Sequence, residues 1–187
     1  MDSKPEKKQK KKNRCAENMK AFLSQRDEYF SALKSNPVPK ITDENPLNII
    51  YSTKQAKLKT QIAIYKNISF FEAVNRIATD LVFWQGINKV LDNFPWGKIE
   101  YCLGNENSPK HGDFTIHQDG IELEGEVFFV APSYFPTKMR NTLKKWENKN
   151  LRYVLFNSDA ASEDDIQKLT ENNPKISFIS VKLSKQF

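Results

Sequence analysis

The sequence predicts an α/β fold in which a mixed β-sheet is flanked by helices, and three observations support this class. Residues 69–93 form a long capped segment whose apolar positions recur at helical spacing. From residue 98 the apolar period changes to two, which is typical of strands. From residue 137 onward, predicted helices alternate with apolar strands, which favours parallel strands joined by right-handed crossovers.

Length and charge limit the number of domains and the kinds of protein that fit this sequence. The 187 residues fit one domain that can bury its own core. The net charge of +6 comes from 29 basic and 23 acidic residues, and it is unevenly distributed. Residues 1–20 carry eight basic and three acidic residues, a net +5, so the rest of the chain is nearly neutral at +1. A uniformly basic, histone-like coat is therefore excluded, whereas a basic arm on a balanced globule is not.

Residues 1–15 are predicted to be a disordered Lys-rich arm. The candidate nucleic-acid-binding residues in it are Lys8, Lys10, Lys11, Lys12 and Arg14. Such an arm can clamp phosphates non-specifically, because each neutralised phosphate releases a counterion. A solubilising tail without a partner explains the same composition equally well.

Neither a membrane protein nor a disulfide-stabilised exported protein is expected. No apolar run approaches the ~20 residues that a membrane span needs. Cys15 and Cys102 do not form a spaced cluster, so neither a disulfide framework nor a zinc site is indicated. We therefore expect an intracellular, cytoplasmic protein with no membrane partner.

An N-terminal helical region is predicted over residues 16–66. A one-sided apolar stripe predicts a helix over 16–34, and the two prolines within 36–39 end it. Residues 47–66 also suit a helix, although the run 49–51 could begin a strand.

The α/β core is predicted over residues 67–187. Its first helix opens with Ser69-Phe70-Phe71-Glu72, a capping box in which Ser69 and Glu72 satisfy each other's backbone N–H groups. The elements that follow are strands at 98–103, 113–117 and 121–130, a helix at 137–149, a strand at 151–157, a helix at 162–172 and a strand at 176–183.

The most informative stretch is the predicted hairpin around Asp119-Gly120. This dipeptide between two alternating segments indicates a two-residue type I′ turn, which requires positive φ at both positions. With that loop, Asp113 lies directly opposite Glu126, and Thr115 lies opposite Glu124, with each pair on one face of the sheet.

Alternation divides the hairpin into two faces. The predicted core face holds Phe114, Ile116, Ile121, Leu123, Val127 and Phe129. The other face holds Asp113, His117, Glu122, Glu124 and Glu126. Opposed carboxylates repel, and a divalent cation such as Mg²⁺ would compensate them. Alternatively this face is a solvated surface, where acids are common, and a one-residue slip would remove the pairing.

The order of elements resembles the PD-(D/E)XK nuclease superfamily, which has the restriction-endonuclease-like fold. The shared order is a helix opening with an acid, a three-stranded meander with Asp on its second strand and Glu-x-Glu on its third, a helix and a parallel strand. The resemblance covers roughly residues 69–183. The "PD" position reads Gly112-Asp113, and the "(D/E)-x-K" position reads Glu126-Val127-Phe128 or Glu124-Gly125-Glu126.

This resemblance implies a nuclease that uses Mg²⁺ (or Mn²⁺) to hydrolyse phosphodiester bonds in nucleic acid, with DNA as the favoured substrate. Asp113 and Glu126 would hold the metal, and Glu124 or Glu72 would complete the shell. Capping alone is sufficient to explain Glu72.

The lysine usual in this family is missing, because Phe128 or Glu126 occupies its place. Some members of the family resemble the second pattern, with Glu in that position, and others carry the lysine on the following helix instead. The candidates for this relocated lysine are Lys138, Lys144 and Lys145, of which we favour Lys138 as the catalytic one.

The missing lysine also permits an alternative hypothesis. In it the chain is a non-catalytic module on the same fold that binds nucleic acid or a protein. Lys144 and Lys145 belong to a basic helix that could face phosphates or simply solvent. The expected partners are nucleic acid, foremost DNA, and then a protein partner in a larger complex or a second copy in a homodimer.

Overall fold

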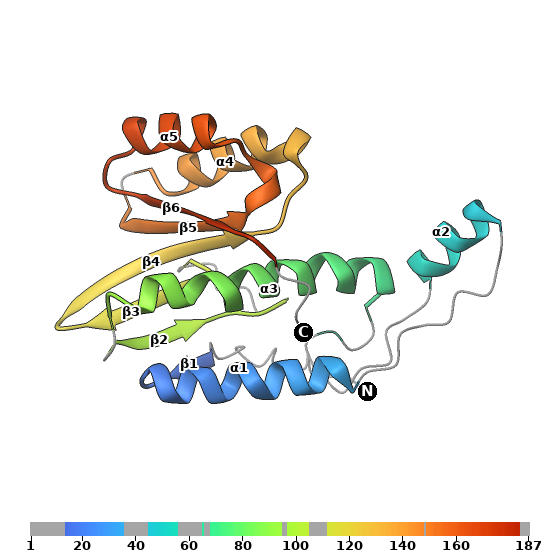
Figure 1. The fold of residues 1–187 in the computed structure, drawn as a ribbon, viewed down its shortest axis with the longest axis horizontal. Helices are drawn as coiled ribbons and strands as arrows, with labels where there is room; N and C mark the ends of the chain where they lie inside the picture. The colour runs from blue at the N-terminus through green and yellow to red at the C-terminus, as the bar shows by residue number, and fades with distance from the viewer. Residues whose placement is uncertain are drawn as a thin grey trace, which may run out of the picture.

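The computed structural model describes residues 14–35, 45–55, 65, 68–94, 97–104, 112–147 and 149–183. Over these residues the chain is an α/β protein with a six-stranded mixed sheet and five α-helices (Figure 1). The predicted arm residues Lys8, Lys10, Lys11 and Lys12 lie outside the described residues.

The strands follow one another across the sheet in the same order as along the chain. They are β1 (Arg14–Ala16), β2 (Lys98–Tyr101), β3 (Phe114–Gln118), β4 (Ile121–Phe128), β5 (Leu151–Asn157) and β6 (Ser177–Val181). Neighbours from β1 to β4 are antiparallel, whereas β4–β5 and β5–β6 are parallel. The parallel crossovers run through α4 (Phe135–Lys145) and α5 (Glu163–Asn172), so the predicted meander followed by strand–helix–strand units is confirmed.

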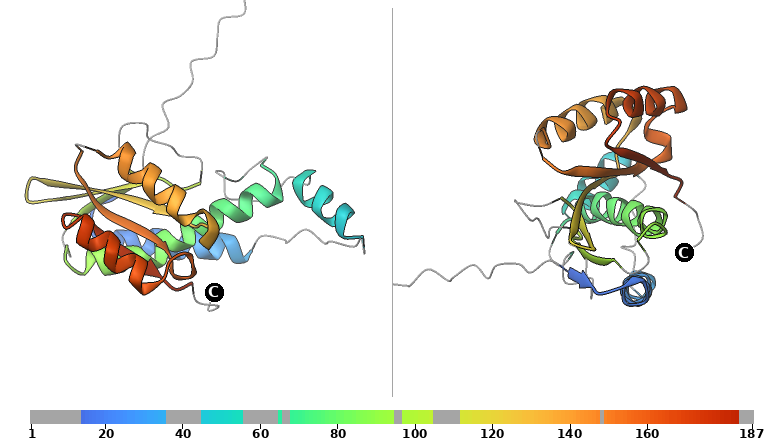
Figure 2. Two further views of the ribbon diagram at one scale, coloured as in Figure 1. Left: turned by 90° about the horizontal axis from the view of Figure 1, so that it is seen from above. Right: turned by 90° about the vertical axis from the view of Figure 1, so that its left-hand side faces the viewer.

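Helices cover both faces of the sheet. Strands β5 and β6 lie between α4 and α5 on one side and α3 (Phe70–Leu91) on the other (Figure 2). Phe22 of α1 (Met19–Lys34) packs against Phe83 and Trp84 of α3 in the larger core. A smaller core under α4 is built around Phe128 and Phe156. In the described part of the chain, no helix is long and apolar enough to cross a membrane.

Helix α3 begins as predicted but is capped differently. The Ser69 hydroxyl accepts a hydrogen bond from the backbone N–H of Glu72 at 3.1 Å, which is the serine half of the box. The Glu72 carboxylate pairs with Arg76 one turn along instead of turning back to Ser69. An ion pair at this spacing competes well with a bond to a neutral N–H, since a charged donor makes the stronger hydrogen bond.

Two N-terminal features differ from or refine the prediction. Arg14 and Cys15, which we expected in the arm, form strand β1 and pair with Tyr101 and Glu100 of β2. Three residues contain too little alternation to signal a strand, so only the sheet edge beside them defines β1. The described first part of the ambiguous region is a helix, α2 (Pro46–Gln55), which lies beyond the N-terminal end of α3 (Figure 1).

Candidate active site

Strands β3 and β4 form the predicted hairpin in the predicted register. Asp119 and Gly120 have φ values of 54° and 77°, as a type I′ turn requires. Thr115 pairs with Glu124, and Phe114 with Gly125. Continuing this register by one residue beyond the start of β3 places Asp113 opposite Glu126.

The core face of the hairpin is confirmed in its centre and wrong at its ends. Phe114, Ile116 and Val127 are buried in the larger core. Ile121 and Phe129 are 55% and 39% exposed. Ile121 lies at the hairpin tip, which extends past α3 (Figure 1), and Phe129 follows the last residue of β4, so neither is covered as the strand centre is.

The acidic face is not a solvated surface near Asp113. Glu124 and Glu126 are only 8% and 4% exposed. Buried carboxylates are rare unless they are paired, because burial removes their hydration. The alternative of a plain solvent-facing strand pair is therefore wrong at these two positions.

Glu126 is held by two groups at the C-terminal end of α4. Its Oε1 accepts a hydrogen bond from Trp146 Nε1 at 2.7 Å and forms an ion pair with Lys145 Nζ. The Lys145 ammonium also lies 5.4 Å from the Trp146 ring centroid. One of the three candidate lysines thus contacts the carboxylate directly.

Lys138, the favoured candidate, lies elsewhere on the same helix. Its ammonium is 5.2 Å from the ring centroid of Phe128. Phe128 occupies the lysine position in the reading Glu126-Val127-Phe128, so a positive charge of α4 lies over the residue that replaces the family lysine. Lys144, the third candidate, has an exposed side chain.

Asp113 lies at the junction of the hairpin and the neighbouring pocket. Its Oδ2 accepts a hydrogen bond from the backbone N–H of Val127 at 2.8 Å. Burial and the nearby Glu126 carboxylate raise the pKa of Asp113 to about 6, against the opposing influence of the Val127 N–H, Lys145 and Lys138. Asp113 therefore binds a proton more readily than an ordinary aspartate does.

Glu124 is engaged within the hairpin. Its Oε2 accepts hydrogen bonds from the backbone N–H of Gly112 at 2.8 Å and from the Thr115 hydroxyl at 2.9 Å. These bonds tie the entrance of β3 to β4. Across the described segments, no group of three or more His, Cys, Asp or Glu side chains is arranged to hold a metal ion. A metal shell completed by Glu124 therefore stays a prediction.

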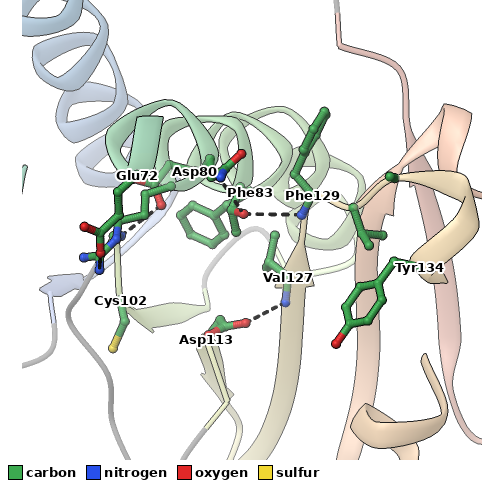
Figure 3. A pocket seen from close by; sticks show the side chains of 14 residues that line it. Glu72, Asp80, Phe83, Cys102, Asp113, Val127, Phe129 and Tyr134 are labelled. Atoms are coloured by element: carbon green, nitrogen blue, oxygen red, sulfur yellow. Dashed lines mark hydrogen bonds and ion pairs between the residues drawn. The ribbon is translucent and has the colours of Figure 1, made fainter. Parts of the chain in front are cut away.

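A pocket with a volume of about 560 Å³ opens beside Asp113 (Figure 3). One wall is the N-terminal half of α3, including Glu72 and Arg76. The opposite wall is the chain after β4, which ends at Tyr134 in the short 3₁₀ helix η2 (Pro132–Tyr134). From this segment, Phe129, Val130, Ala131 and Tyr134 line the pocket.

Asp80 is a buried acid of this wall that the sequence analysis missed. Its carboxylate accepts hydrogen bonds from the Tyr29 hydroxyl at 3.2 Å and from the backbone N–H of Gly104 at 3.0 Å. Tyr29 lies 2.8 Å from the Tyr65 hydroxyl, oxygen to oxygen, and burial together with Asp80 raises the pKa of Tyr29. This network fixes α1 and the end of β2 to α3. The available signal was an acid within the apolar stripe that includes Ile77 and Trp84.

No family model, curated protein or solved structure matches this chain.

Proposed function

We propose that the chain is a divalent-metal-dependent nuclease of the PD-(D/E)XK type that hydrolyses phosphodiester bonds in nucleic acid, with DNA as the favoured substrate. The observation that carries the proposal is the pairing of Asp113 with Glu126 where β3 begins, beside an open pocket and under a helix that bears lysines. The element order agrees with a restriction-endonuclease-like core, since α3, the meander β2–β4, α4 and β5 follow one another.

The donor set suits Mg²⁺ or Mn²⁺. Mg²⁺ is usually bound through one or two protein carboxylates and keeps several waters, so Asp113 and Glu126 together are sufficient protein ligands. Burial and, after it, the nearby Glu126 carboxylate raise the pKa of Asp113, and a cation would offset the charge of both carboxylates. When bound, the cation would lower the pKa of a water molecule and offset the negative charge that develops on the phosphodiester.

The lysines of α4 have separate roles in this proposal. Lys145 and Trp146 hold the Glu126 carboxylate in one orientation through its Oε1. The Lys138 ammonium, over Phe128, supplies the positive charge that stabilises the anionic transition state. Lys145 is therefore a positioning residue, whereas Lys138 is the catalytic one.

Cleavage of supercoiled plasmid in Mg²⁺ or Mn²⁺, compared with EDTA, tests the proposal. We expect metal-dependent nicking that falls at least ~100-fold in Asp113→Asn and Glu126→Gln. Lys138→Met should lower the rate by a similar factor, because removing one electrostatic donor costs ~10²–10³-fold. Glu122→Gln is the matched control, since Glu122 lies on the same strand with a side chain that is 64% exposed. Equal nicking by wild type and Asp113→Asn would refute the assignment.

One observation favours a second candidate, a non-catalytic nucleic-acid-binding module on the same fold. The Glu126 Oε1 is occupied by Lys145 and Trp146, and an aromatic ring stands at the usual lysine position. Such a module would bind DNA in Mn²⁺ without cutting it, and Asp113→Asn would leave its affinity unchanged or higher.

A further inference from the structure

We propose that the pocket beside Asp113 binds one unpaired nucleotide, so that the substrate is single-stranded nucleic acid rather than intact duplex. This inference rests on the proposed function and specifies its substrate class. Arg76 and Tyr134, on opposite walls of the pocket, carry the argument.

Arg76 is a basic residue in the wall of the pocket, and one of its nitrogen atoms lacks a partner. Its Nη2 pairs with Glu72, whereas Nη1 is shielded from solvent and, within the described part of the chain, has no hydrogen-bond partner. A buried unpaired donor is costly, and such atoms call for a partner. The planar guanidinium matches the oxygens of a phosphate group. The Arg76 side chain is 21% exposed, and a small shift of it would let a phosphate supply the acceptor that Nη1 lacks.

Tyr134 offers an exposed aromatic face on the opposite wall. Its side chain is 54% exposed, although the ring lines the pocket and faces it from the wall opposite Glu72 (Figure 3). Aromatic rings in such positions stack on bases without regard to sequence, and each stacked base contributes ~1–3 kcal/mol. A phosphate site on one wall and a stacking face on the other match the two ends of a nucleotide.

Two acids of the pocket already have donors of their own. Glu72 pairs with Arg76, and Asp80 accepts hydrogen bonds from the Tyr29 hydroxyl and the backbone N–H of Gly104. The remaining acid is Asp113, whose partner Glu126 lies in the proposed metal site. A nucleotide in the pocket therefore lies next to the bond that this pair would hydrolyse.

Pocket size and stacking geometry favour an unpaired nucleotide. The volume of about 560 Å³ lies in the range that holds one small ligand. A base inside a duplex is stacked on both faces, so it reaches a side-chain platform only after it leaves the helix. A single strand presents its bases at no such cost.

Fluorescence anisotropy of the full chain, with EDTA present, tests this inference with labelled short oligo(dT) and a blunt duplex of equal length. We expect the single strand to bind at least ~5-fold more tightly than the duplex, the lower limit for one stacked base. Tyr134→Ala should weaken single-strand binding ~5–150-fold, while Tyr134→Phe retains it. Arg76→Gln should weaken it ~10-fold or more, since a hydrogen bond to a charged group is lost.

Two variants are matched controls. Tyr51→Ala removes an exposed aromatic ring from α2, and Arg26→Gln removes a half-buried arginine that pairs with Asp27 on α1. Both should bind oligo(dT) as the wild type does, and circular dichroism melting establishes that each variant is folded.

The possible outcomes distinguish failure of the pocket inference from failure of the nuclease proposal. Equal affinity for both oligonucleotides, binding of neither, or full single-strand affinity in Tyr134→Ala would overturn the pocket inference. If plasmid cleavage still depends on Asp113 in that case, the nuclease proposal survives alone. Tyr134-dependent binding of oligo(dT) without any cleavage in Mn²⁺ would support the pocket and overturn the nuclease.

Discussion

Replacing Asp113 with asparagine should stabilise the metal-free protein at neutral pH. The side chain in Asp113→Asn would be neutral, whereas the wild-type carboxylate is ionised beside Glu126 in a partly buried position. Asparagine has nearly the same shape and keeps an oxygen that can accept the Val127 N–H. The substitution therefore removes mainly the charge.

The size and sign of the effect follow from the pKa. A carboxyl group with a folded-state pKa of about 6, against an ordinary value of 3.8, binds its proton more tightly in the folded than in the unfolded state. Its ionised form therefore opposes folding above pH 6, and this penalty disappears as the pH falls toward 4. This shift in pKa corresponds to a loss of folding free energy of about 3 kcal/mol at pH 7 and less than about 1 kcal/mol at pH 4.

Urea unfolding in EDTA at pH 7 and at pH 4 measures this directly. We expect Asp113→Asn to raise the free energy of unfolding at pH 7 by up to about 3 kcal/mol, with most of the gain absent at pH 4. Asp27→Asn is the control, because Asp27 is exposed and its ion pair with Arg26 contributes little. A destabilised Asp113→Asn at pH 7, or a gain that is the same at both pH values, would refute the reasoning.

Three further predictions concern neighbouring residues. Lys145→Met should lower the free energy of unfolding by ~1–3 kcal/mol. This loss is smaller than for a fully buried ion pair, because Lys145 is half exposed. Adding Glu126→Gln to the Lys145→Met chain should restore part of the lost stability. Gly125→Ala should destabilise by at least ~1–3 kcal/mol in urea, because its Cβ would lie 2.0 Å from the ring of Phe114. Lys138→Met should reduce the single-turnover cleavage rate ~10²-fold or more without changing the free energy of unfolding by more than ~1 kcal/mol.

Matched variants control these three predictions. Lys144→Met removes an exposed lysine of the same helix, so stability and cleavage should stay close to those of the wild type. Gly120→Asn introduces a side chain into open space at a φ of 77°, which asparagine tolerates, so it should cost much less than Gly125→Ala. A Lys138 effect no larger than that of Lys144 would remove Lys138 from the mechanism.

The pairing within the hairpin could be predicted from the local sequence. Asp119-Gly120 specifies a two-residue turn, and that turn fixes every pairing along β3 and β4. The opposition of Asp113 and Glu126 is therefore readable from the sequence, because it depends only on counting outward from the turn.

The surroundings of that pair depend on contacts distant in sequence. The contacts of Glu126 come from Lys145 and Trp146, which lie 19 and 20 residues further along the chain. Lys138 and Lys145 lie seven residues apart and so share one helix face, which is why the sequence could not separate their roles. How α4 packs on the sheet decides which of them contacts the carboxylate.

The other residues of the site also differ in whether the local sequence indicates them. Asp80 carried a local signal, because an acid interrupts the apolar stripe of α3. Arg76 and Tyr134 carried none, since an arginine on a helix and a tyrosine in a Pro-rich connection are ordinary in isolation. They become a candidate site only when β4 brings the two walls of the pocket together.

The central claim is that Asp113 and Glu126 together hold a divalent cation, and Mn²⁺ binding followed by electron paramagnetic resonance tests it without requiring activity. We predict that the wild type and Glu122→Gln bind Mn²⁺ at one dominant site per chain, and that Asp113→Asn and Glu126→Gln each weaken this binding ~10-fold or more. Mn²⁺ binding that is absent from the wild type, or that is unchanged in both variants, would contradict the claim.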